Sequence, residues 1–256
     1  VDLRTLPMPA ENGDYAVSEP AAPGSNNFAV AGSRTADGRA IVANDMHLGL
    51  GAPNIWFRAR LTYADARAPG GRVDVSGFTL PGIPAVIVGS NTHVAWGFTN
   101  SYGDWLDFYR VEFTDEDKLK YRVPGGIAAL RVASEWIQVK GGDPVELKVR
   151  ETRWGPITRE LDDGSALALR WTAQLPGSLN FGLADLAWAG NLDQGLAVAD
   201  TAGIPAQNLM MADRNGRIAW RLTAQMPERA GDCAATAPLR VEQGCRWAGW
   251  LPPTEN

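Results

Sequence analysis

The chain has 256 residues, of which 45% are hydrophobic and 21% charged, and its formal net charge is −5 at pH 7. These values are ordinary for a folded globular protein, and the length allows one domain or two. The acidic balance and the lack of a basic run argue against nucleic acid as a partner. No apolar stretch approaches the ~20 residues that a membrane helix needs.

Residues 1–24 are rich in Pro, Ala and Glu and follow neither a strand nor a helix period, so we interpret them as an extended linker. The pattern changes after Gly24, where 28–32 and 40–43 are short β-like runs. The Asp37-Gly38 pair between them is typical of a hairpin turn.

Short strands punctuated by Gly and Pro dominate the remainder. They are expected at 56–63, 73–79, 85–89, 93–98, 107–113, 135–140, 145–153, 166–171, 208–212 and 217–223. The best helix candidate is 184–201, where Leu, Trp and Val recur at helical spacing. The chain is therefore predicted to be a strand-dominated α+β unit.

Three segments carry the functional signal. They are Gly24-Ser25-Asn26-Asn27, then Asn44-Asp45-Met46-His47-Leu48, and finally 89–100, which contains Trp96-Gly97-Phe98-Thr99-Asn100 and runs on to Asp104 and Asp107. Their order and spacing resemble the serine-type N-terminal-nucleophile hydrolases of the penicillin acylase family over most of residues 24–250. The resemblance implies an αββα sandwich, with 1–24 as the end of a spacer and 25–256 as the N-terminal, incomplete part of the catalytic β-subunit.

Ser25 would be the nucleophile of such an enzyme. In the family a precursor cuts itself before this residue, which here is the Gly24–Ser25 bond. The freed α-amine, with a pKa of about 7.7–8.0, can then accept the proton of the hydroxyl. Before cleavage, the Ser25 hydroxyl must attack the carbonyl of Gly24. A glycine at position 24 suits the strained backbone geometry that this attack requires.

The resemblance assigns four more residues to the reaction. His47 lies 22 residues after Ser25 and matches the position that is histidine in cephalosporin, lipopeptide (aculeacin) and acyl-homoserine-lactone acylases; it is expected to orient the Ser25 hydroxyl or amine. The backbone N–H of Asn100 and the side-chain amide of Asn208 match the donors that stabilise the substrate oxyanion. Arg229 matches an arginine that supports the nucleophile region.

Other matches concern the acyl group and a metal. The positions that line the acyl pocket are apolar or aromatic: Met46, Leu48, Val88, Phe98 and Tyr102. Aliphatic Leu48 and Val88 favour an aliphatic acyl chain. Asp104, Leu106 and Asp107 resemble part of a calcium site, although three ligands fall short of the 6–8 that Ca²⁺ takes. The chemistry itself needs no cofactor.

Cys233 and Cys245 flank a short segment that a disulfide could close, with two unpaired thiols as the alternative. A disulfide and the family resemblance both favour a periplasmic or secreted protein. The α-subunit and the remaining β-subunit segment of the same precursor are the expected partners, and a small acyl amide is the expected substrate. We expect the 256-residue chain alone to be inactive.

Two alternatives stay open. One is a family member that has lost activity, against which the intact set of Ser25, His47 and Asn208 argues. The other is a secreted carbohydrate-binding module, because ten tryptophans are many for this length. Stacking on sugars needs exposed rings, whereas most of the tryptophans are expected to be buried by their apolar context: Trp56, Trp96, Trp105, Trp171, Trp188 and Trp220.

Overall fold

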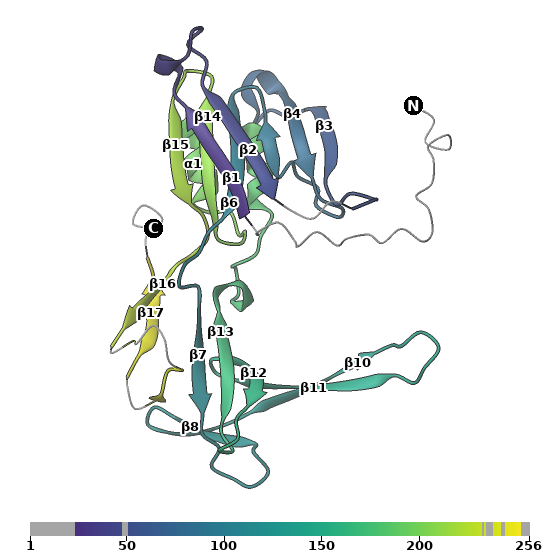
Figure 1. The fold of residues 1–256 in the computed structure, drawn as a ribbon, viewed down its shortest axis with the longest axis vertical. Helices are drawn as coiled ribbons and strands as arrows, with labels where there is room; N and C mark the ends of the chain where they lie inside the picture. The colour runs from purple at the N-terminus through teal and green to yellow at the C-terminus, as the bar shows by residue number, and fades with distance from the viewer. Residues whose placement is uncertain (1–23, 48–50, 232, 234–237, 242–243, 252–256) are drawn as a thin grey trace, which may run out of the picture.

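The computed structural model describes residues 24–47, 51–231, 233, 238–241 and 244–251 (Figure 1). The predicted spacer up to residue 23 and the pocket candidate Leu48 lie outside these residues. Within the described residues, no helix is long and apolar enough to cross a membrane.

A six-stranded antiparallel sheet forms the upper body of the molecule (Figure 1). Its strands, in spatial order, are β15 (Ile218–Leu222), β14 (Gln207–Asp213), β6 (Val94–Asn100), β5 (Val88–Ser90), β4 (Arg72–Thr79) and β3 (Phe57–Ala64). The central strand β6 is largely buried, as its apolar run Val-Ala-Trp-Gly-Phe predicts.

Helical segments cover one face of this sheet and close the larger hydrophobic core. They are the 3₁₀ helix η5 (Gly182–Trp188) and the helix α1 (Leu192–Ala199). Met211 of β14 packs against Gly195 of α1, where any Cβ would clash with the methionine methyl group. The side chain of the buried Asn91 donates to the carbonyls of Leu186 and Ala189, at 2.8 and 2.7 Å, and so ties η5 to the β5–β6 turn.

A hairpin of β1 (Gly24–Val30) and β2 (Ile41–His47) crosses the other face of the sheet, over β6 and β14 (Figure 1). Two asparagine side chains attach it. Asn27 Nδ2 donates to the carbonyls of Gly97 and Asn208, each at 3.2 Å. Asn44 pairs with the backbone of Phe98 in both directions, donating to its carbonyl at 2.8 Å and accepting from its N–H at 3.1 Å.

The lower body has its own core and is built on a five-stranded antiparallel sheet. In order, its strands are β10 (Arg131–Ile137), β11 (Val145–Thr152), β12 (Gly155–Glu160), β13 (Ala166–Trp171) and β7 (Leu106–Val111). Trp154 stacks on Tyr109, with ring centroids 4.9 Å apart, and meets Tyr121 edge-on. The β10–β11 hairpin projects to one side (Figure 1).

Short elements complete the chain. Two small hairpins are β8 (Lys120–Val123) with β9 (Gly126–Ala129), and β16 (Pro227–Ala230) with β17 (Arg246–Trp250). Single 3₁₀ turns are η2 (Gly32–Arg34), η3 (Pro69–Gly71) and η4 (Thr172–Gln174). Cys233 and Cys245 form a disulfide, with their Cα atoms 5.1 Å apart, which resolves the alternative that the sequence left open.

The predicted dominance of strands is confirmed, and each of the ten strands expected after residue 50 overlaps an observed strand. The predicted helix over 184–201 is confirmed only in part, since η5 and α1 occupy most of the range. It is interrupted after Trp188, and a new helix begins after Asn191, whose side chain accepts from the N–H of Gln194.

The prediction that most of the six tryptophans named in the sequence analysis are buried is wrong. Of these six, only Trp96 is buried, and Trp171 and Trp220 are exposed.

The close approach of Asn44 to β6 depends on a glycine. A Cβ on Gly97 would lie 2.9 Å from the Cβ of Asn44 and therefore force the hairpin away. We expect Gly97→Ala to lower the free energy of unfolding by about 1–3 kcal/mol and to speed amide exchange in β1 and β2. Chemical denaturation and hydrogen exchange would measure both.

Gly126→Ala is the matched control, because a Cβ at Gly126 meets nothing within 4 Å. It should change the unfolding free energy by less than about 0.5 kcal/mol. Equal stability of the two variants would contradict the role given to Gly97.

Candidate active site

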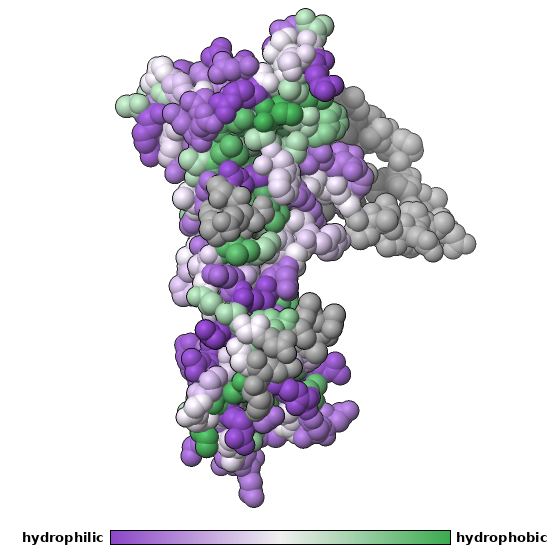
Figure 2. Space-filling model, turned by 90° about the vertical axis from the view of Figure 1, so that its left-hand side faces the viewer, coloured by the Kyte–Doolittle hydropathy of each residue, from purple (hydrophilic) through white to green (hydrophobic). Residues whose placement is uncertain are grey.

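An apolar pocket of about 630 Å³ opens beside the N-terminal end of β1. Figure 2 shows apolar surface, in green, in the upper body among polar side chains. Ser25 and Met46 line the pocket on the hairpin side, and Val88, Phe98 and Asn100 line it on the sheet side. Leucine, isoleucine and aromatic side chains from other segments complete the wall: Trp56, Leu80, Ile83, Ile87, Leu179, Phe181, Leu183 and Ile204.

Ser25 reaches this pocket because of the strand alternation in β1. Ser25 is the register partner of Met46, and directly opposite residues of an antiparallel pair share one face. Both side chains are half-buried and turned towards the sheet, whereas Gly24 and Asn26 are exposed. The bond between Gly24 and Ser25 lies at the start of β1, next to the residue that lines the pocket.

His47 lies on the opposite face of the hairpin. Its register partner is Gly24, one residue from the Ser25–Met46 pair, and its ring is exposed. Alternation therefore brings His47 next to the backbone at Gly24 but keeps its side chain away from the face that carries the Ser25 hydroxyl.

Sequence reasoning missed the carboxylate beside His47. Nε2 of His47 lies 2.8 Å from Oδ2 of Asp45, two residues earlier on β2, and 3.4 Å from Nδ2 of Asn26. The i, i+2 spacing of Asp45 and His47 could have indicated this contact, since residues i and i+2 of a strand share a face.

The other histidine, His93, lies beside Arg214. Burial, and to a lesser extent the charge of the arginine, lower the pKa of His93.

Asn100 and Asn208, the two predicted oxyanion donors, lie side by side. Gln207 and Asn208 of β14 are the register partners of Asn100 and Thr99 of β6. Asn208 Nδ2 donates to the backbone carbonyl of Asn100 at 3.0 Å, and Asn208 Oδ1 accepts from Trp220 Nε1 at 3.1 Å. Asn100 lines the pocket and Asn208 does not, so this hydrogen bond holds the amide of Asn208 next to the pocket that Ser25 also lines.

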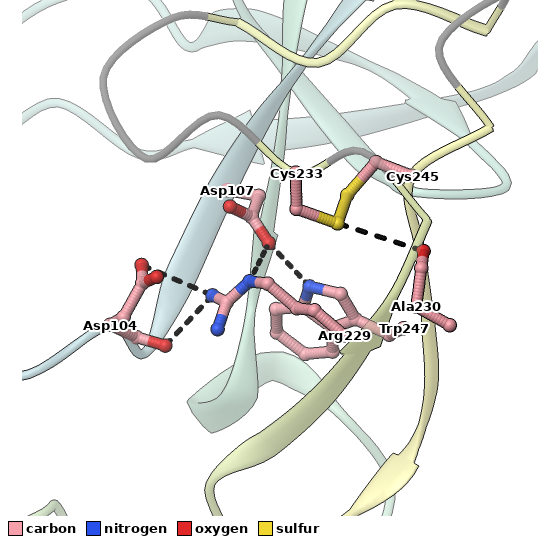
Figure 3. The surroundings of a disulfide bond; sticks show 7 residues. All are labelled: Asp104, Asp107, Arg229, Ala230, Cys233, Cys245 and Trp247. Carbon is pink, nitrogen blue, oxygen red and sulfur yellow. Dashed lines mark hydrogen bonds and ion pairs between the residues drawn. A yellow bond between two sulfur atoms is a disulfide. The ribbon is translucent and has the colours of Figure 1, made fainter.

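Arg229 binds the two aspartates that were considered as metal ligands (Figure 3). Its Nε donates to Asp107 at 2.9 Å, and its terminal nitrogen contacts the carboxylate of Asp104 at 3.1 Å and the carbonyl of Asp104 at 2.8 Å. Trp247 Nε1 also donates to Asp107. The structure thus places the guanidinium of Arg229 against Asp104 and Asp107, not against Ser25.

The arrangement around Asp104 and Asp107 does not fit a calcium ion. Asp107 is largely buried and already accepts from two donors, while the positive charge beside it is the guanidinium. Ca²⁺ needs more oxygen ligands than these two carboxylates and the Leu106 carbonyl supply. Within the described parts of the chain, no group of three or more acidic, histidine or cysteine side chains could hold a metal.

Of the predicted pocket residues, Met46, Val88 and Phe98 line the pocket. Tyr102 does not, and its side chain is 95% exposed. The larger part of the lining was not predicted, because residues 179–184 and 203–207 reach the pocket only through the fold.

Comparison with known proteins identifies the family. The model of the penicillin amidase family matches residues 2–256. The chain is 30% identical to the acyl-homoserine lactone acylase QuiP of Pseudomonas aeruginosa, over 80% of this chain and 25% of that protein. It is 31% identical to the penicillin acylase 2 proenzyme of Pseudomonas sp. strain SE83, over 96% of this chain and 31% of that protein.

The fold is also similar to that of a solved acylase structure. The structure matches the thermostable penicillin G acylase of Alcaligenes faecalis with a TM-score of 0.79 at 23% identity, over 90% of this chain and 40% of that chain. The chain spans about a quarter to a third of the length of the two curated relatives. The family match along nearly its whole length shows that this chain belongs to the penicillin amidase family of amide-hydrolysing acylases.

Proposed function

We propose that the chain is the central part of an acylase precursor that cleaves itself before Ser25 and then hydrolyses linear amides of hydrophobic acyl groups. The observation that carries this proposal is the position of Ser25, directly after Gly24, in the lining of an apolar pocket of about 630 Å³ that Asn100 also lines.

Self-cleavage begins with Ser25. Its Oγ attacks the carbonyl carbon of Gly24, the C–N bond breaks, and an ester with a free Ser25 α-amine results. Water opens the ester and leaves the Gly24 carboxylate. His47 and the paired Asp45 lie beside the backbone at Gly24, on the face opposite the Ser25 side chain. That position favours a role for His47 at the scissile peptide or at the new α-amine over direct contact with the hydroxyl.

Substrate hydrolysis reuses the same groups. The Ser25 hydroxyl gives its proton to the α-amine and attacks the acyl carbonyl, and the negative oxygen is stabilised by the backbone N–H of Asn100 and the amide of Asn208. The leaving amine takes the proton, and water then releases the acid from the acyl-serine. None of these steps needs a metal or a cofactor.

The wall of the pocket favours an aliphatic acyl chain. Val88 and Ile87, together with Leu183, present branched aliphatic side chains to the cavity. Two relatives are named for acyl-homoserine lactones and for penicillin, and both of those substrates are acyl amides. Within that class we propose a hydrophobic, mainly aliphatic acyl group.

The remaining parts of the enzyme are also proposals. The β1–β2 hairpin, the six-stranded sheet and the η5–α1 layer would be three layers of an αββα sandwich. An α-subunit and the rest of the β-subunit, from the same precursor, would complete the catalytic domain. The Cys233–Cys245 disulfide supports a periplasmic or secreted location, since such bonds persist in oxidising compartments.

Self-cleavage is tested by the intact mass of the complete precursor. We expect the wild type to be cut between Gly24 and Ser25, and Ser25→Ala to stay whole because it lacks the attacking hydroxyl. Ser33→Ala is the control: Ser33 is exposed in η2, so this variant should be cut normally. A folded wild-type precursor that stays whole would contradict the proposal.

Acyl selectivity is tested at Val88, which lines the pocket and is only 6% exposed. Val88→Phe should shorten the pocket and lower kcat/KM for long acyl chains by roughly 10–200-fold, with a smaller effect on short chains. Val132→Phe, at an exposed position of β10, is the matched control. An equal effect on all chain lengths would argue against this pocket as the acyl site.

A further inference from the structure

Trp220 is an exposed aromatic residue with a specific polar contact. It lies on β15 with 53% of its surface exposed. Its register partner is Met210, two residues from Asn208 on the neighbouring strand β14, so Trp220 and Asn208 share one face of the sheet. The indole Nε1 donates to Asn208 Oδ1 at 3.1 Å.

The partners of Asn208 favour one orientation of its amide. An indole N–H can only donate and a backbone carbonyl can only accept, whereas a primary amide does one at each end. Trp220 therefore selects the oxygen of Asn208, and the Asn100 carbonyl selects its NH₂ group. A 180° rotation of the amide would bring two acceptors together at Asn100 and two donors together at Trp220.

The selected orientation leaves a donor for the reaction. One N–H of Asn208 is used by the Asn100 carbonyl, and within the described residues the second has no protein partner. Asn100 lines the pocket that Ser25 also lines, and the hydrogen bond to its carbonyl keeps the amide of Asn208 next to that pocket. Donors that are already aligned stabilise a developing oxyanion better than donors that must first rotate.

We propose that Trp220 is a positioning residue that holds the amide of Asn208 with its NH₂ group towards the substrate oxyanion. The inference rests on the proposed acylase function and adds a residue that acts through Asn208. It also gives a reason for the exposure of this ring, which the core of the upper body does not use.

The test uses Trp220→Phe and Trp220→His in the complete precursor. Phenylalanine keeps a ring but removes the donor, and the loss of a net hydrogen bond should lower kcat roughly 3–10-fold with KM within about twofold. Histidine keeps a ring N–H and should restore part of the lost kcat. Trp136→Phe, at an exposed position of β10, is the matched control and should keep wild-type turnover.

A double-mutant cycle with Asn208→Ala separates positioning from a general structural effect. If Trp220 acts through Asn208, Trp220→Phe causes no further loss of kcat when Asn208 is already alanine. Asn208→Ala alone should cost more than Trp220→Phe, roughly 10²–10³ in kcat. Additive losses of kcat in the double mutant would overturn the inference, and so would a wild-type kcat in Trp220→Phe. Neither result would contradict the proposed function as long as turnover still depends on Ser25.

A second readout does not depend on activity. In the 256-residue chain with ¹⁵N-labelled tryptophan, the indole N–H of Trp220 should exchange with solvent several-fold faster in Asn208→Ala than in the wild type. An unchanged exchange rate overturns the hydrogen bond, and with it the inference. A wild-type precursor without Ser25-dependent turnover overturns the proposed function as well.

Discussion

The β1–β2 hairpin is fixed to the central sheet by side-chain amides, and the site depends on that attachment. The side chains of Asn27 and Asn44 make hydrogen bonds to backbone groups of β6 and β14. These bonds resemble those of a neighbouring strand, but they come from the hairpin that lies over one face of the sheet. Such contacts restrict the distance between the hairpin and the sheet, since N–H···O hydrogen bonds join atoms about 2.7–3.2 Å apart. Gly97 makes the approach possible. The same geometry places Ser25, two residues before Asn27, over the end of β6 where Asn100 lies.

Because side chains alternate along a strand, the candidate functional side chains lie on two opposite faces of the hairpin. Ser25 and Met46 face the pocket, whereas His47, Asp45 and Asn26 form a polar cluster on the outer face beside Gly24. Gly24 is the register partner of His47 and so occupies the position beside it. Removal of that residue would expose the α-amine of Ser25 at the same place. We therefore infer that His47 is better placed to act on the backbone nitrogen of Ser25 than on its hydroxyl.

The local patterns of the sequence predicted the strands well and the side-chain environments less well. The observed β13 coincides with the predicted 166–171 because period-2 alternation and flanking turn residues are local signals. At the break in the predicted helix 184–201, Asn91 donates to the carbonyls of Leu186 in η5 and of Ala189 just after it, a contact from far away in the chain that local patterns do not reveal. The exposure of Trp220 was missed because the alternation of a strand does not tell which face the rest of the protein covers. The resemblance assigned Ser25, Phe98 and Asn100 to one site, and all three line the same pocket, a neighbourhood that no local pattern indicates.

The lower body is joined to the site through a charged contact. Asp104 follows Asn100 by four residues, and Arg229 of β16 holds both its carboxylate and its carbonyl, while Asp107 at the start of β7 completes the contact. The disulfide between Cys233 and Cys245 closes the β16–β17 hairpin that carries Arg229 (Figure 3). A guanidinium with a fixed charge and several donors can orient two carboxylates without a metal. The segment after Asn100 is thereby restrained by a residue of the lower body, and the disulfide that supports this restraint is of the kind that forms in an oxidising environment.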